Sequence, residues 1–362
     1  MNAFEVLRVI AALWVLFSHA FAFYGLPEPI VFSGHTNVAV DVFFSISGYL
    51  VIQSWARDPN LGRFLLRRGL RIFPGLIVAV FVTTFVVGGI ATNLKLTDYF
   101  FSYQTWVYVI SNIGLTVSVD ELPGVFENNT YPRAFNGSLW TLRYELLMYF
   151  LLALLGGLGL VLRRPQVTKQ FCLLLFLIFL LLGITLSLQG VTNQTAPFPL
   201  LWRLGFSFDI VRIANLGINF FLGCCLYLYR EQIRLSFWFV LPVLLIALFL
   251  PSSIWQQLLI WFLVPYMTIV TAWNAPALLK KFRGFDYSYG IYIYAFPLQQ
   301  LVAMYGAPRH WSFGLTLLCS LALTLIAASL SWHWIEHPAL ALKPVKPRAD
   351  SLAAKQFVAT NL

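Results

Sequence analysis

Long apolar segments alternate with short polar ones along this chain, and each apolar segment is about as long as a membrane is thick. A helix crosses the hydrocarbon core of a bilayer with roughly 20 residues. No stretch has the regular apolar–polar alternation of a transmembrane β-strand. The pattern therefore predicts an all-α polytopic membrane protein with about ten transmembrane helices. The expected spans are 4–24, 37–54, 72–91, 138–160, 171–190, 209–229, 236–251, 254–274, 285–305 and 311–335.

The third and fourth spans are joined by a long connection, residues 92–137. It contains the aromatic stretch YFFSYQTWVYVI and then the polar run DELPGVFENNTYPRAFNGS. Connections of this length are usually functional or disordered. We expect the aromatic stretch to be either a re-entrant piece or an interfacial helix.

Composition agrees with a chain that lies almost entirely in the membrane. Of 362 residues, 59% are hydrophobic and 10% are charged, whereas a soluble protein carries about 25% charged residues. Arg8 and His19 interrupt the first apolar run, so we interpret it as a transmembrane helix and not as a signal peptide. We expect residues 1–342 to form one membrane-embedded domain and 343–362 a short disordered tail.

The distribution of Lys and Arg predicts the orientation. With a cytoplasmic N-terminus, seventeen of these residues fall in inside loops or the tail and five outside, which favours both termini in the cytoplasm. Topology thus explains the net charge of +10, and we expect no nucleic-acid partner. The four cysteines lie in apolar stretches without metal-ligand spacing, so we expect neither a disulfide nor a metal site.

His19 is the most informative residue, because ionisable side chains within a span are costly and are functional candidates by default. Asp41 lies near the start of the next span, at a similar distance from the connecting loop. A carboxylate at that depth would orient the imidazole for general-base chemistry. Arg8 precedes His19 by eleven residues, about three helical turns, on the same helix face roughly 16 Å away. The alternative is a polar clamp between helices.

The fourth span contributes Glu145, flanked by Trp140 and Arg143. We expect Glu145 to approach His19 and Asp41 from the outer half of the membrane, so that three helices bring together one imidazole and two carboxylates. In the alternative reading, Glu145 only pairs with Arg143 or Arg8.

On the cytoplasmic side, Arg68 and Arg71 are three residues apart and share a face if their segment is helical. Paired guanidiniums bind phosphate with two hydrogen bonds each. They therefore predict a site for a phosphorylated ligand, unless they form only a topogenic charge cluster.

Small and aromatic polar residues lie between these two faces. Ser45 and Ser47 are polar positions in the second span, and Gly48 allows a neighbouring helix to approach closely. Tyr289 and Tyr292 share one face of the ninth span, where they line a polar cavity or belong to an aromatic belt.

In this order and at this spacing, these motifs resemble acyltransferase family 3, over nearly the full chain. The matching positions are Arg8 and His19; Phe43, Phe44, Ser47 and Gly48; Arg68 and Arg71; Ser138, Leu139, Trp140 and Glu145; and Ser331, Glu336 and Pro338. One departure is Ala295, where many members have a histidine before the proline of the tyrosine-rich helix.

The resemblance implies a bacterial inner-membrane enzyme that O-acylates sugars of a surface polysaccharide, lipopolysaccharide or lipid-linked glycan. Acyl-CoA would then be the cytoplasmic donor, with acetyl the expected group and succinyl its rival, and no cofactor would be permanently bound. His19, oriented by Asp41, would act as the general base or as a transient acyl carrier. Glycan-assembly proteins would be the partners. Two alternatives from other classes are a secondary transporter or exporter of a glycan intermediate, and a structural partner in a glycan-assembly complex.

Overall fold

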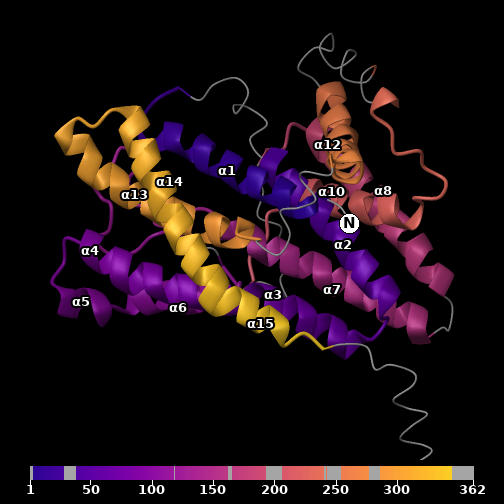
Figure 1. Ribbon diagram of the computed structural model, residues 1–362, viewed down its shortest axis with the longest axis horizontal. Helices are drawn as coiled ribbons and strands as arrows, with labels where there is room; N and C mark the ends of the chain where they lie inside the picture. The colour runs from indigo at the N-terminus through magenta and orange to yellow at the C-terminus, as the bar shows by residue number, and fades with distance from the viewer. Residues whose placement is uncertain are drawn as a thin grey trace, which may run out of the picture.

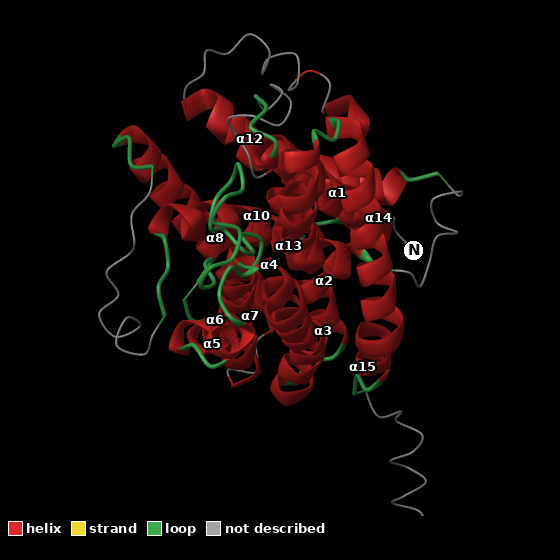
Figure 2. Cartoon of the chain, turned by 90° about the vertical axis from the view of Figure 1, so that its left-hand side faces the viewer, coloured by secondary structure: helices red, strands yellow, loops and turns green. Residues whose placement is uncertain are grey.

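The computed structural model describes residues 3–27, 38–117, 119–161, 165–192, 206–239, 242, 254–276 and 286–344. Within these ranges the chain forms helices and no strand (Figure 2). The long helices are α1 (Phe4–Phe23), α2 (Val38–Arg57), α3 (Leu61–Val82), α6 (Tyr103–Gly114), α7 (Trp140–Val161), α8 (Pro165–Leu188), α10 (Ile210–Leu228), α12 (Ile254–Asn274), α13 (Ser288–Gly306) and α14 (Phe313–Ser331). The short ones are α4 (Gly89–Ala91), α5 (Leu96–Phe100) and α15 (His337–Ala341), with single turns of 3₁₀-helix at Phe237–Phe239 and Ala307–Arg309.

Eight helical runs among the described residues are long and apolar enough to cross a membrane. They are Phe4–Phe23, Val38–Arg57, Leu61–Ala91, Trp140–Gly159, Gln166–Leu188, Ile210–Leu228, Trp255–Asn274 and Phe313–Ala341. This confirms an all-α polytopic membrane protein. The predicted span 236–251 lies largely outside the described residues.

The ninth predicted span forms a helix, α13, that is not among these eight. It carries polar side chains, yet almost all of its residues are buried. Other helices cover it: α13 packs against α14 and α1, which Figure 1 shows on the left of the molecule, with α8, α10 and α12 on the right. Tyr and Gln side chains can occupy such a helix because protein, not lipid, surrounds them.

Helices α2 and α10 pack closely together, and glycines on both make this possible. A Cβ added at Gly48 would lie 1.9 Å from the carbonyl oxygen of Phe220, and one added at Gly223 would lie 2.3 Å from that of Ser45. Small residues let backbones of membrane helices approach in this way. The predicted role of Gly48 in close packing is confirmed.

Helix α3 begins eleven residues before the predicted third span, at Leu61 instead of 72. Asn60 caps it by accepting a hydrogen bond from the Arg63 amide at 2.9 Å. The helix runs on through a π-helical segment, Thr83–Gly88, into α4. Because of the early start, the arginines of this region stand on a regular helix. The aromatic stretch that follows forms α5 and α6, at the lower left of Figure 1.

Candidate active site

A cavity of about 310 Å³ lies among α1, α2, α3, α7, α13 and the segment after α15. Its volume is at the lower end of the range for small-molecule sites, roughly 300–1,000 Å³. Seven of the twelve predicted site residues line it: Arg8, Ser47, Arg68, Arg71, Glu145, Tyr289 and Tyr292. These seven residues, singled out from the sequence, lie on five separate helices that form the cavity wall.

Arg8 and Arg71 share one carboxylate, that of Asp286. The Arg8 Nη2 and Arg71 Nη2 atoms lie 2.9 and 2.8 Å from Asp286 Oδ2. Ser288 Oγ donates to Asp286 Oδ1 at 2.5 Å. One carboxylate thus holds two guanidiniums from different helices at the cavity wall. Asp286 was missed, although it is an acidic residue at the edge of an apolar span, the same signal that singled out Asp41.

Arg68 and Arg71 lie on one face of α3, as their spacing predicted, and both line the cavity. Arg68 differs from Arg71 because the described part of the chain places no carboxylate within ion-pair distance of it. Its Nε is buried without a hydrogen-bond partner there, and its guanidinium carbon lies 5.7 Å from the centre of the Tyr149 ring. Arg68 is therefore available to an anionic ligand.

Glu145 belongs to this cavity and not to a cluster with His19. Its Oε1 accepts a hydrogen bond from Ser47 Oγ at 3.0 Å and another from the Tyr149 hydroxyl. Tyr149 lies one turn further along α7 and was not predicted. Position 145 on α7 therefore faces α2 and the arginines, which the sequence alone could not show.

The two predicted tyrosines anchor α13 to the cavity wall. The Tyr289 hydroxyl donates to the Ile72 carbonyl at 2.7 Å, and the Tyr292 and Thr141 hydroxyls are 2.8 Å apart. Both rings line the cavity. Of the two readings left open by the sequence, cavity lining describes these residues.

No hydrogen bond joins His19 and Asp41, which were expected to lie in or near contact, among the described residues. Asp41 is buried and its Oδ1 accepts from Asn219 Nδ2 of α10 at 2.9 Å. His19 packs edge-on against Phe296 of α13, with ring centres 5.0 Å apart, and its buried Nδ1 has no hydrogen-bond partner among the described residues. Their similar distances from the connecting loop suggested a shared depth. However, Asp41 lies on the face of α2 that contacts α10, and His19 lies on the face of α1 that contacts α13.

The expected cluster of His19, Asp41 and Glu145 is consequently not formed. Asp41 instead lines a second cavity of about 420 Å³ together with Trp140 and Arg212, whose guanidinium carbon lies 4.3 Å from the centre of a Trp140 ring.

Two further predicted residues lie outside the arginine cavity, the one lined by Arg8, Arg68 and Arg71. Ser45 is fully buried and donates to the Asp41 carbonyl at 2.6 Å, within its own helix. Arg143 packs over the Tyr144 ring at 5.2 Å. Packing accounts for both contacts. Among the described residues, no group of three or more His, Cys, Asp or Glu side chains is arranged to hold a metal ion.

One face of α13 leads from the cavity to His19. Tyr289 and Tyr292 line the cavity, and Phe296, about one turn further on, contacts His19. Phe43 of α2, also a lining residue, packs edge-on against Tyr292 with ring centres 5.5 Å apart. A row of aromatic contacts along α13 therefore runs from the cavity wall to His19.

Comparison with known proteins agrees with this assembly of motifs. Residues 1–333 match the family described as an acyltransferase domain. The chain is 31% identical over 341 residues to the O-acetyl transferase of Shigella phage Sf6, covering 92% of this chain and 95% of that protein. It is 26% identical over 364 residues to nodulation protein 10 of Rhizobium leguminosarum bv. viciae, covering 94% of each. No solved structure matches. The chain, with its membrane helices and cavity of family residues, belongs to acyltransferase family 3 and is a multi-pass membrane O-acyltransferase.

Proposed function

We propose that the arginine cavity binds acyl-CoA, in particular acetyl-CoA, from the cytoplasmic side of a bacterial inner membrane. The observation that carries this proposal is the convergence of Arg8, Arg68 and Arg71 on one cavity, with Arg68 free of a carboxylate partner in the described chain. Charge-assisted hydrogen bonds from guanidiniums suit the phosphates of coenzyme A. The name of the phage relative supports acetyl as the transferred group.

The acceptor is proposed to be a sugar hydroxyl of a surface polysaccharide, lipopolysaccharide or lipid-linked glycan, with glycan-assembly proteins as partners. In the reaction the hydroxyl oxygen forms a bond to the thioester carbonyl carbon, and the carbon–sulfur bond breaks. His19 takes the proton of the hydroxyl and the coenzyme A thiolate leaves. His19 Nδ1 is a nitrogen without a partner in the described chain, so it does not first need to give up a hydrogen bond.

Within this scheme Glu145 acts at the donor end. It holds the hydroxyls of Ser47 and Tyr149 at the cavity wall, where they face the acyl-bearing arm of the donor. Asp41, bonded to Asn219, supports the packing of α2 on α10, and no hydrogen bond within the described chain joins it to the base.

Binding of acyl-CoA to the purified protein in detergent tests the donor site. Arg68→Ala and Arg71→Ala should each weaken binding about ten- to a hundredfold, because a lost charge-assisted contact costs roughly 1.5–3 kcal/mol. Arg63→Ala is the matched control, since Arg63 stands on the same helix but pairs with Asp58 outside the cavity. Unchanged affinity in both cavity variants would reject the site, and a membrane assay with labelled acetyl-CoA that yields no acylated glycan would reject the reaction.

A further inference from the structure

The chain places a fourth cation in the arginine cavity. Lys343 lies two residues beyond α15, is half-buried, and lines the cavity with Arg8, Arg68 and Arg71. Burial, and then the nearby guanidiniums of Arg68, Arg71 and Arg8, lower the pKa of Lys343 to about 8, and the carboxylate of Asp286 offsets this shift only in part. The surroundings of Lys343 therefore disfavour its protonated form, and a bound anion would stabilise that form.

The carboxylates of this cavity do not provide that anion. Asp286 is bonded to Arg8 and Arg71, and Glu145 accepts from two hydroxyls. Glu5, the third carboxylate that lines the cavity, lies on α1 near Arg8. In the described part of the chain, no carboxylate lies within ion-pair distance of Lys343 or of Arg68. Two cations that line one cavity thus lack an anionic partner.

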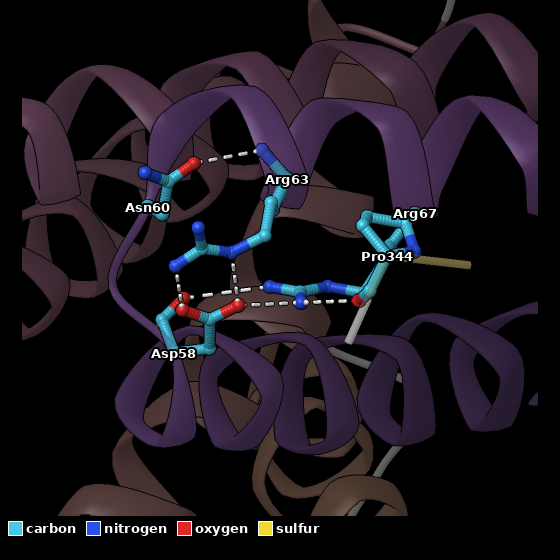
Figure 3. Close-up of polar contacts among 5 residues, drawn as sticks. All are labelled: Asp58, Asn60, Arg63, Arg67 and Pro344. Atoms are coloured by element: carbon cyan, nitrogen blue, oxygen red, sulfur yellow. Dashed lines mark hydrogen bonds and ion pairs between the residues drawn. The ribbon is translucent and has the colours of Figure 1, made fainter. Parts of the chain in front are cut away.

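A polar network holds the backbone beside Lys343 against α3 (Figure 3). Asp58 pairs with Arg63 at 2.6 Å and with Arg67 at 2.7 Å. Arg67 Nη1 also donates to the Pro344 carbonyl at 3.4 Å, whereas the Arg63 side chain bonds Asp58 and makes no hydrogen bond to Pro344 among the residues drawn. Because Pro344 follows Lys343 directly, Arg67 limits where the lysine side chain can stand.

The cations follow one another along the cavity. Lys343 lies two residues beyond α15, and Pro344, which follows it, contacts Arg67 in the second turn of α3. The end of α15 lies near the beginning of α3 (Figure 1). Arg68 is two turns into α3, and Arg71 lies three residues, about 4.5 Å, further along the axis. A ligand that enters with its thioester first has its adenosine end nearest Lys343.

We propose that Lys343 binds the 3′-phosphate on the adenosine of coenzyme A, while the arginines bind the diphosphate. This rests on the proposed acyl-CoA donor. Lys343 is then a binding residue that distinguishes coenzyme A from its 3′-dephospho form, and Arg67 is a positioning residue that acts through the backbone at Pro344.

Calorimetric titration of the full-length protein in detergent with coenzyme A and with 3′-dephospho-coenzyme A tests the assignment. The wild type should bind coenzyme A about tenfold more tightly. Lys343→Gln should remove that preference by weakening coenzyme A alone, and Lys343→Arg should restore it. Lys95→Gln, at an exposed lysine beside α5, is the matched control and should bind both ligands as the wild type does.

The outcomes separate the two proposals. If the wild type binds neither ligand, the donor proposal and the assignment of Lys343 both fail. If the wild type binds coenzyme A and Lys343→Gln keeps its preference, or loses both ligands equally, the assignment fails and the donor proposal stands.

The role of Arg67 is tested by the pair Arg67→Gln and Arg63→Gln, since both arginines bond Asp58 but only Arg67 reaches Pro344. Arg67→Gln should reduce the preference for coenzyme A about threefold, Arg63→Gln should not, and Arg67→Gln should add nothing to Lys343→Gln. Equal effects of the two variants, or a further loss in the double variant, would refute positioning through Lys343.

Discussion

Replacing Asp286 with asparagine removes the charge that Arg8 and Arg71 share while it preserves the shape of the side chain. The side chains of Asp286, Arg71 and Arg8 are 8%, 15% and 20% exposed, so solvent screens the two ion pairs only partly. Removing one partner of a buried ion pair costs about 3–5 kcal/mol, because the remaining charge is left uncompensated. The amide oxygen still accepts one hydrogen bond, so we expect a loss of about 3 kcal/mol, roughly 150-fold in the unfolding equilibrium.

The free energy of unfolding, measured by titration with a denaturing detergent, provides the assay. A second measurement adds coenzyme A. Its phosphates supply the negative charge that Asp286→Asn lacks, so the ligand should stabilise the variant more than the wild type. Asp98→Asn is the control, because Asp98 is exposed in α5 and its replacement should change the free energy by no more than about 0.5 kcal/mol.

Two results would refute this reasoning. An Asp286→Asn variant within about 0.5 kcal/mol of the wild type would mean that the ion pairs give no net stabilisation. A variant that loses stability but gains no extra protection from coenzyme A would mean that the two guanidiniums do not face the bound donor.

Three further predictions concern other parts of the molecule. His19→Ala should abolish acyl transfer to the glycan at normal expression and membrane insertion; near-normal O-acetyl content would make His19 a packing residue. Gly48→Ala would place a Cβ 1.9 Å from the Phe220 carbonyl oxygen and should lower the free energy of unfolding by about 3 kcal/mol or more. Gly157→Ala is the control and should be tolerated, because no atom lies within 4 Å of its added Cβ. The affinity for coenzyme A should fall as the pH rises through about 8, where the Lys343 ammonium loses its proton. Lys343→Arg should make the affinity nearly independent of pH between 7 and 9. The same pH dependence in both proteins would exclude Lys343 as the titrating group. Because the pKa of Lys343 is lowered in the folded protein, its charge costs stability below about pH 8, and this cost disappears as the pH rises towards the unfolded value near 10.4.

The sequence by itself determined the membrane class and the position of most helices along the chain. Hydropathy is a property of consecutive residues, and a bilayer requires each apolar segment of about 20 residues to satisfy its own backbone hydrogen bonds as a helix. The spacing of Arg68 and Arg71 was likewise local, because three residues on one helix define one face. Gly48 could also be interpreted locally, since its lack of a Cβ has the same consequence whichever helix packs there.

Only the tertiary structure decided which way each helix turns about its own axis. Asp41 faces Asn219 and His19 faces Phe296 because contacts such as Gly48 against Phe220 fix the rotation of neighbouring helices. Depth in the membrane carries no information about that rotation. Asp286 and Lys343 join arginines more than 200 residues away in sequence, and nothing in the spacing along one segment specifies a partner on another. Helix packing alone brings these charges into one cavity.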